Sequence, residues 1–243
     1  MILLPHNSWE IKTTQKKGRG IFATKDITPG TVIGDYIGQV LRTAEVDTVE
    51  KEEGLYLMYY HDYASLYPTD INQPGIHLAN HSCAPNCWMY IYKGHTLFFS
   101  LRHIFKGEEL TISYLLPPDP FCNPCQHRCH CESKQCVGTM HLHEDQFLRW
   151  QAFSQTQAKQ TKRKRIYYGK ELAKLSDYPT SIADNPIYPL IGFSEKTSVS
   201  LPDTHLPSVA KLRTLVRETG RTLAFPKLAT TIIGIQDDLV LSK

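Results

Sequence analysis

Short runs of β-branched and aromatic residues, separated by turn-forming residues, recur through the first half of the chain. Six such runs stand out: 21–23, 31–33, 36–38, 88–92, 96–99 and 110–114. Their length and composition predict strands. Only Lys93, Gly94 and His95 separate the fourth run from the fifth. Because glycine readily takes the positive φ of a tight turn, these two runs predict a β-hairpin.

Helical patterns are confined to a few segments. Residues 43–53 are acidic and contain no glycine or proline, which predicts one exposed helix. Residues 144–175 and 208–220 also have helix-forming composition. Five prolines between 176 and 207 predict an extended linker, and residues 230–235 a short strand. Strands and helices do not alternate regularly, which argues against a Rossmann sheet. The sequence predicts a mostly β protein with some α-helix.

Composition narrows the function classes. The chain has 243 residues, of which 41% are hydrophobic and 21% charged, so it has enough apolar surface to fold around a core. A net charge of +3 is too small for a uniformly basic coat on nucleic acid. No apolar run reaches membrane-span length, and the N-terminal apolar stretch is too short for a secretory signal. We therefore expect a nuclear or cytoplasmic protein that is not secreted by a standard signal peptide and has no membrane partner.

The cysteines point to metal binding. Five of the seven cysteines lie between positions 122 and 136. In a chain without a signal peptide, such crowding favours metal ligation over disulfides. Cys129, Cys131 and Cys136 have the spacing C-x-C-x4-C and would supply three thiolates to a tetrahedral zinc ion. Spacing alone does not choose the fourth ligand, for which the candidates are Cys83, Cys87, Cys122 and Cys125.

Four segments together resemble the motifs of SET-domain protein-lysine methyltransferases. Residues 80–87, Asn-His-Ser-Cys-Ala-Pro-Asn-Cys, match the N-H-S-C-x-P-N-C signature of that family, and residues 107–114 resemble its G-E-E-L-T-x-x-Y segment. Residues 17–23 are similar to its opening G-x-G strand. The C-x-C-x4-C segment resembles its zinc-binding post-SET tail. The four motifs occur in the family's order.

The resemblance implies an organisation for the chain. It implies a SET domain at 9–116, of mostly β fold with a knot-like signature loop, and a zinc-binding post-SET tail at 117–140. Residues 141–243 lie outside the resemblance and form a C-terminal, partly helical region of unknown role.

The resemblance also implies an activity and its residues. The expected reaction is methyl transfer from S-adenosylmethionine to a lysine ε-amine, with Tyr114 and Tyr36 as the catalytic tyrosines. The residues expected to bind the cofactor are Lys17, Gly18, Arg19, Gly20, Tyr56, Asn80, His81 and His130. The ligands expected for Zn²⁺ are Cys83, Cys129, Cys131 and Cys136. Cys122 and Cys125 are additional, so a second metal or a competing ligand set stays open.

Two departures from the family pattern bear on the site. His77 stands where many members have arginine, three residues before the Asn-His pair. Ile112 stands where the family usually has phenylalanine or tyrosine, two residues before the catalytic tyrosine. Isoleucine has no hydroxyl to hold a water beside the amine, so we expect di- or trimethylation.

The substrate and other partners are less constrained by sequence. We expect a protein substrate with a lysine-containing tail, such as a histone. Residues 155–174 hold seven basic residues against one acidic residue. The core of this run, Lys162, Arg163, Lys164 and Arg165, would be a nuclear-localisation signal, would contact DNA or a nucleosome, or would be a solvated helix face. Two alternatives remain: a non-catalytic SET module that binds peptide or nucleic acid, and a methyltransferase for non-histone proteins.

Overall fold

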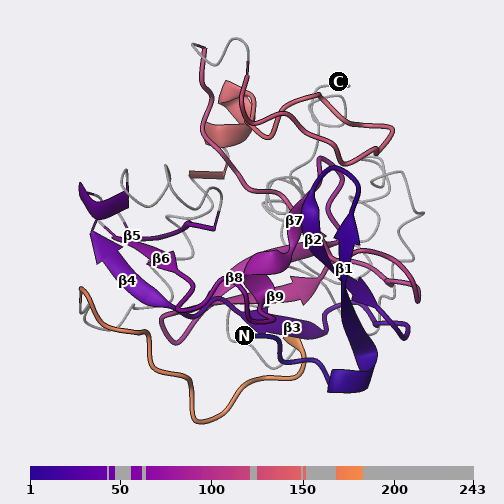
Figure 1. The fold of residues 1–243 in the computed structure, drawn as a ribbon, viewed down its shortest axis with the longest axis vertical. Coiled ribbons are helices and arrows are strands. Elements are labelled where there is room, and N and C mark those ends of the chain that lie inside the picture. The colour runs from indigo at the N-terminus through magenta and orange to yellow at the C-terminus, as the bar shows by residue number, and fades with distance from the viewer. Residues whose placement is uncertain are drawn as a thin grey trace, which may run out of the picture.

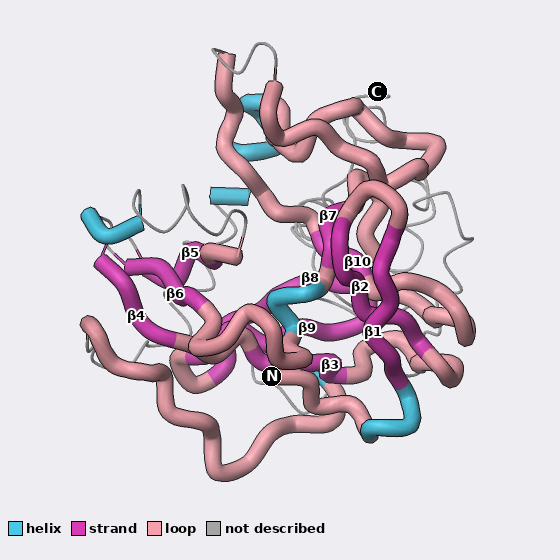
Figure 2. Tube along the Cα trace, in the orientation of Figure 1, coloured by secondary structure: helices cyan, strands magenta, loops and turns pink. Residues whose placement is uncertain are grey.

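The fold is built mainly from short strands joined by long loops (Figures 1 and 2). The computed structural model describes residues 1–42, 44–46, 56–61, 64–120, 125–148, 150–151 and 168–182. Within these residues the strands are β1 (Trp9–Thr14), β2 (Gly18–Ala23), β3 (Val32–Asp35), β4 (Gln39–Arg42), β5 (Met58–His61), β6 (Ala64–Tyr67), β7 (Asn80–His81), β8 (Cys87–Tyr92), β9 (His95–Ser100) and β10 (Thr111–Ile112). Two 3₁₀ turns, η1 (His6–Ser8) and η2 (Ile76–Leu78), complete the elements.

A largely buried three-stranded sheet has the order β3-β9-β8. β8 and β9 form the expected hairpin, in continuous register from Cys87↔Ser100 to Tyr92↔His95. Lys93 and Gly94 make its two-residue turn with φ values of 48° and 86°, the left-handed pair that matches the twist of a hairpin. All six residues of β9 are buried, so this strand is the centre of the core.

Two short strands far apart in sequence are brought together by parallel pairing. β10 pairs with β7 in the register Thr111↔Asn80 and Ile112↔His81. The loop after β7 is then fixed by Asn86, whose Nδ2 donates to the Glu109 carbonyl at 2.8 Å. The segments 80–87 and 107–114 therefore lie side by side.

A third sheet, β4-β6-β5, was not expected from the sequence, and the strand expected at 36–38 is wrong. Residues 36–38 are an irregular link between β3 and β4. A Cβ on Gly38 would lie 2.0 Å from the Tyr67 carbonyl oxygen, so only glycine fits where the link crosses the end of β6. The strand expected at 110–114 is shorter than predicted and covers only Thr111–Ile112.

Residues 168–182 form an extended strap, orange in Figure 1, which packs back onto the first half of the chain and runs beneath β4 and β3. Val40 exchanges backbone hydrogen bonds with residues 169–170, and the Val32 N–H donates to the Thr180 carbonyl at 2.9 Å. Ile182 at its end is 2% exposed. Residues 168–175 are not helical, so the helix expected at 144–175 is wrong for this part.

Other helical expectations are tested only in part. Residues 44–46 and 144–148 are helical. The remainder of 43–53, the segments 208–220 and 230–235, and the basic run at 162–165 lie outside the described residues. None of the described helices has the length and hydrophobicity needed to cross a membrane.

Candidate functional site

An apolar cavity of about 170 Å³ opens between the core sheet and the segments around β7 and β10. Its walls are mainly aromatic and aliphatic side chains, among them Tyr36, Phe98, Ile112, Tyr114 and Trp150. β10 supplies Ile112, and the link between β3 and β4 supplies Tyr36. A lining of this kind suits an elongated, mostly apolar side chain with a polar tip.

Two tyrosines expected to be catalytic, Tyr36 and Tyr114, line this cavity. The Tyr114 hydroxyl donates to the Ala79 carbonyl at 3.4 Å, and the Tyr36 hydroxyl donates to the Tyr56 carbonyl. Burial raises the pKa of both phenols, so both hydroxyls stay protonated at neutral pH. They can therefore orient a bound amine through hydrogen bonds, and neither is available as a phenolate base.

Tyr114 is held in place by the Asn-His pair. Its backbone N–H donates to Nδ1 of His81 at 3.1 Å, and the two rings contact edge to face with centroids 5.4 Å apart. Burial lowers the pKa of His81 to about 4, so the ring is neutral at pH 7 and can accept this hydrogen bond.

Glu109 is the meeting point of Asn80 with the segment 17–20. Lys17, Gly20 and Asn80 all approach its carboxylate. Asn80 Nδ2 donates to Glu109 Oε1 at 2.7 Å and to the Arg19 carbonyl at 3.1 Å, and Lys17 forms an ion pair with Glu109. A Cβ on Gly20 would lie 2.5 Å from Glu109 Oε1, so glycine is required for this close approach. A role for Glu109 was not predicted from the sequence, although its place in the G-E-E-L-T motif is a signal that could have marked it.

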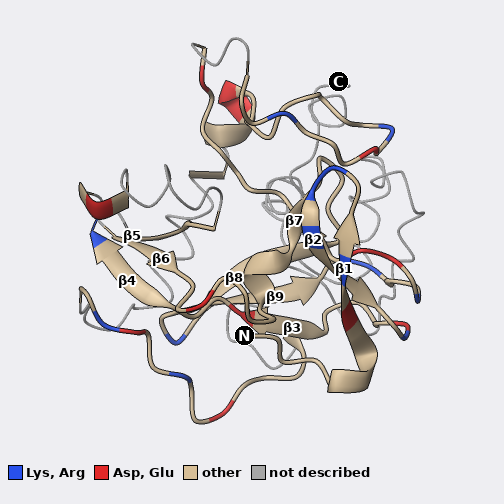
Figure 3. Cartoon of the chain, viewed as in Figure 1, with Lys and Arg blue, Asp and Glu red and all other residues tan. Residues whose placement is uncertain are grey.

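Gly18 shows where this segment is accessible. Its φ is +70°, and a Cβ there would meet nothing within 4 Å. The turn between β1 and β2, just before Gly18, carries lysines (Figure 3). Lys16 of that turn is paired with Glu132 and Lys17 with Glu109, so the feature left open in this segment is the backbone at Gly18, which has room for a ligand.

The rings of Tyr56 and His77 contact each other edge to face, with centroids 5.7 Å apart. His77 replaces an arginine of the family pattern, and its Nε2 lies 3.2 Å from the Ile71 carbonyl. Burial lowers the pKa of His77 to about 4. Arg19, a neighbour in space, donates to the carbonyls of Ile71 and Asn72. His77 and Arg19 together fix the loop that precedes η2.

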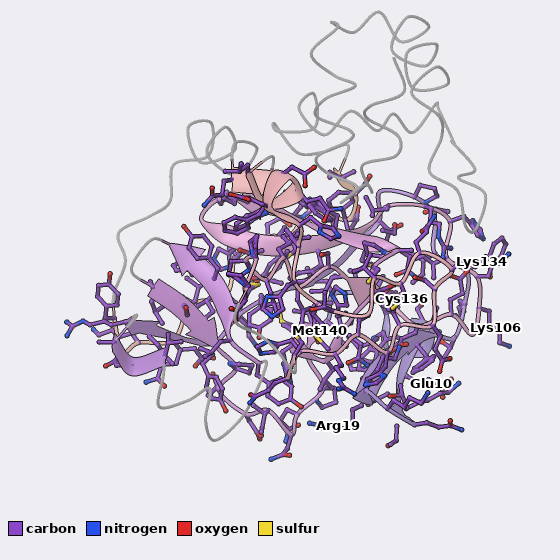
Figure 4. All side chains as sticks on the ribbon, turned by 90° about the horizontal axis from the view of Figure 1, so that it is seen from above. Glu10, Arg19, Lys106, Lys134, Cys136 and Met140 are labelled. Atoms are coloured by element: carbon purple, nitrogen blue, oxygen red, sulfur yellow. The ribbon has the colours of Figure 1, made fainter. Side chains whose placement is uncertain are left out.

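Four cysteine sulfurs form a compact group. Those of Cys83, Cys129, Cys131 and Cys136 all lie within 4.8 Å of one another, and Cys83 Sγ is 3.6 Å from Cys129 Sγ. Tetrahedral zinc with Zn–S bonds of about 2.3 Å puts sulfurs about 3.8 Å apart, so this donor set fits the ion in number, type and spacing. A hydrogen bond from Cys83 lowers the pKa of Cys131, which favours a thiolate there. In Figure 4, Lys134 lies at the outer edge of the molecule and Cys136 lies further inward.

The structure brings together most, though not all, of the expected site residues. His130 is exposed and is not among the residues that line the cavity, so its expected contact with the cofactor stays a prediction. Cys122 lies outside the described residues. Cys87 is 2% exposed, and its Sγ donates to Asn86 Oδ1, away from the four-sulfur group.

Comparison with known proteins matches part of this chain to a family. Residues 18–115 match the family model described as the SET domain. The "Histone-lysine N-methyltransferase trithorax" of Drosophila virilis is 33% identical over 128 residues, which cover 49% of this chain and 3% of that protein. The "Histone-lysine N-methyltransferase, H3 lysine-36 specific" of Yarrowia lipolytica is 34% identical over 142 residues, covering 54% of this chain and 18% of that protein. The chain thus spans less than a fifth of the length of these relatives.

Proposed function

We propose that this chain, which belongs to the SET-domain family through residues 18–115, transfers methyl groups from S-adenosylmethionine to a lysine ε-amine of a protein substrate. The observation that carries the proposal is the apolar cavity into which Tyr36 and Tyr114 both face. The substrate lysine would enter this cavity with its stem against the aromatic walls and its nitrogen near the two hydroxyls.

The apolar lining supports the chemistry of the amine. A free lysine has a pKa of about 10.4 and is an ammonium at neutral pH, which cannot attack a methyl group. Burial in an apolar cavity favours the neutral amine, and a nearby sulfonium adds repulsion in the same direction. The amine then needs only alignment with the S–CH₃ bond, so no covalent enzyme intermediate is required.

Tyr114 and Tyr36 would align that amine. Because each protonated hydroxyl donates its hydrogen to a backbone carbonyl, its oxygen can accept from an N–H of the lysine amine and leave the amine lone pair free to face the methyl group. The hydrogen bond from the Tyr114 N–H to His81 fixes the backbone from which the Tyr114 ring projects. We assign Tyr114 to orientation of the amine.

Eight residues predicted from the sequence are proposed to hold the cofactor. They are Lys17, Gly18, Arg19, Gly20, Tyr56, Asn80, His81 and His130. When bound, S-adenosylmethionine supplies a methyl group activated by a sulfonium. The free space at Gly18 supports the placement of its carboxylate end against the backbone there.

Zinc would join the tail to the signature loop. Three of its ligands lie in the tail and the fourth, Cys83, follows the Asn80-His81 pair. A bound Zn²⁺ would therefore fix the residues 117–140 against the SET domain proposed for residues 9–116, and would hold the cavity in shape. The region 141–243 contributes the strap at 168–182 to that body.

The finer assignments extend the proposal. Relatives named as histone-lysine methyltransferases support a histone tail as substrate and hence work in a nucleus or on chromatin. Ile112 lines the cavity without a hydroxyl, which supports di- or trimethylation. Contact with DNA through the basic run at 162–165 stays a hypothesis for a segment outside the described residues.

A methyl-transfer assay with mass-spectrometric readout tests the proposal. Purified chain is incubated with S-adenosylmethionine and either core histones or whole lysate, beside the Tyr114→Phe variant. We expect methyl-lysine on histones from the wild-type chain and little from the variant. Methylation confined to lysate proteins would assign a non-histone substrate. No transfer to any protein, with folded and zinc-loaded material, would identify a non-catalytic SET module and refute the proposal.

A further inference from the structure

A second group of metal-ligating side chains, in the tail and at the residue just after it, lies beside the four-cysteine cluster. One ligand atom each from Cys125, His127 and His141 lies within 4.8 Å of the others. None of these residues belongs to the first cluster. We propose that these three side chains form a second binding site for a divalent cation of borderline softness, such as Zn²⁺. The proposal rests on the ligand geometry and does not depend on methyl transfer.

The hydrogen bonds of His141 prepare it as a ligand. Its Nδ1 lies 2.6 Å from the Pro117 carbonyl oxygen, which can only accept, so Nδ1 carries the proton. Nε2 of the neutral ring is then the atom with the free lone pair, and it faces His127. Metal-binding histidines are commonly oriented in this way, by a carbonyl that accepts from the nitrogen opposite the metal.

The distances are close to those of a tetrahedral site. His127 Nδ1 and His141 Nε2 are 3.0 Å apart, with the rings inclined at 68°. Two nitrogens at about 2.0–2.1 Å from tetrahedral zinc lie about 3.3 Å from each other, so the ion needs them to separate by only about 0.3 Å. The fourth coordination position of the ion would be filled by a donor other than these three residues. Cys122 lies outside the described residues and is not part of the proposed site.

Backbone pairing holds the ligands in register. The Met140 N–H donates to the His127 carbonyl at 2.9 Å, and Arg128 forms a bridge with Thr139. On the other side, His141 forms a parallel bridge with Leu116. Because this frame is made by the main chain, the site is largely formed before an ion enters it.

Thr139, which belongs to neither cluster, contacts a cysteine of each. The Thr139 carbonyl lies 3.8 Å from Cys83 Sγ, whereas its hydroxyl lies 3.5 Å from Cys125 Sγ. Figure 4 labels Cys136 of the first cluster and Met140, the residue between Thr139 and His141. Leu116, the bridge partner of His141, lines the cavity. A second ion would therefore fix one wall of the cavity to the tail.

Metal stoichiometry of the full chain tests the proposal. The protein is loaded with Zn²⁺, dialysed and measured by plasma mass spectrometry, as wild type and as the variants His141→Ala, His127→Ala and His143→Ala. His143 is exposed and near in sequence, so it is the matched control. We expect two ions in wild type and in His143→Ala, and one in each of the other variants.

A cobalt titration of the wild-type chain decides the result without relying on a variant that fails to fold. Two equivalents of Co²⁺ should bind, and the two should differ in thiolate-to-metal absorption because one site holds four thiolates and the other holds one. Saturation at one equivalent, or a His141→Ala variant that still holds two zinc ions, would overturn the proposal.

Discussion

The backbone N–H of Tyr114 donates a 3.1 Å hydrogen bond to Nδ1 of His81, a residue 33 positions earlier in the chain. The parallel pair β7–β10 places the two residues for this contact, with Ile112 opposite His81. The residue proposed to orient the substrate amine is thus attached to the loop proposed to hold the methyl donor. In the proposed reaction, alignment of the amine with the methyl donor would depend in part on this contact.

Replacement of Tyr114 by phenylalanine should lower kcat and leave the binding of S-adenosylmethionine intact. Loss of the hydroxyl frees the amine from its orienting partner, and misplacement of a reacting group commonly costs about 10²-fold in rate. We expect kcat to fall by about that factor, with the affinity for S-adenosylmethionine unchanged by calorimetry. Tyr92→Phe, a change of the same kind away from the cavity lining, is the control. Equal kcat in Tyr114→Phe and wild type would exclude the assigned role.

Replacement of Ile112 by tyrosine should change the product. Ile112 is 8% exposed and lines the cavity beside Tyr114. A new hydroxyl there would hold a water in the space that a methylated amine needs. Mass spectrometry of the histone product should show monomethyl-lysine accumulating in the variant, and di- or trimethyl-lysine in wild type. Ile112→Val, which adds no hydroxyl, should keep the wild-type distribution.

Removal of the metal should loosen the tail and reduce activity. Cys83 connects the signature loop to the three cysteines of the tail, so Cys83→Ser should cost one zinc ion per chain. Metal sites of this type stabilise the folded state directly, so a lower Tm is expected for the variant and for chelator-treated protein. Cys87→Ala, at a buried cysteine outside both clusters, is the comparison variant. An unchanged zinc content in Cys83→Ser would remove Cys83 from the ligand set.

The strap should stabilise the fold through a buried carboxylate. Asp35 is fully buried, and its Oδ2 accepts from the Tyr178 hydroxyl at 2.8 Å and from His95 Nδ1 at 2.7 Å. Tyr178→Phe leaves this carboxylate with one donor fewer, which should lower the free energy of unfolding by about 1–3 kcal/mol in urea titrations. Tyr59→Phe, at a residue 51% exposed, should change it by less than about 0.5 kcal/mol. If the two variants lost the same free energy of unfolding, the hydrogen bond from the Tyr178 hydroxyl to Asp35 would not be a source of stability.

Stability should depend on pH through His77. The ordinary pKa of histidine is about 6.5. Burial lowers the pKa of His77 to about 4, although the hydrogen bond to Ile71 acts in the opposite direction and raises it. Between these values the unfolded chain binds more protons than the folded one, so the contribution of His77 is complete above pH 6.5 and is lost as pH falls towards 4.

Replacement by glutamine tests this assignment. His77→Gln keeps an N–H donor for the Ile71 carbonyl but cannot titrate, so the pH slope of the unfolding free energy should decrease by up to about 1.4 kcal/mol per pH unit. His143→Gln, at an exposed histidine, should leave the slope as it is. A slope equally steep in His77→Gln would assign the titration to another group.

The sequence was informative where local chemistry decides structure. The hairpin around Gly94 was predictable because a two-residue turn with positive φ fixes its own register. The fold class was predictable from strand-like runs, and the loop with Asn80 and Cys83 from its motif. In each case residues near in sequence carry the signal.

The sequence was uninformative where distant backbone decides structure. Nothing local marks residues 36–38 as irregular, because the reason is the approach of Gly38 to the Tyr67 carbonyl. The strap at 168–182 has no periodic pattern, since its partners are backbone groups of β3 and β4. Glu109 was overlooked because its role depends on Lys17 and Asn80, which join it only in the folded chain.

The strap also sets an order of events during biosynthesis. Tyr178 reaches Asp35 across 143 positions, so the ribosome finishes β3 long before it makes the segment that covers it. At about 5–20 residues per second, this interval lasts about 7–30 s. Throughout that time the nascent chain presents an uncovered strand edge and an acid with an incomplete set of donors. Truncated or stalled chains that end before the strap are therefore expected to depend on chaperones more than the finished protein does.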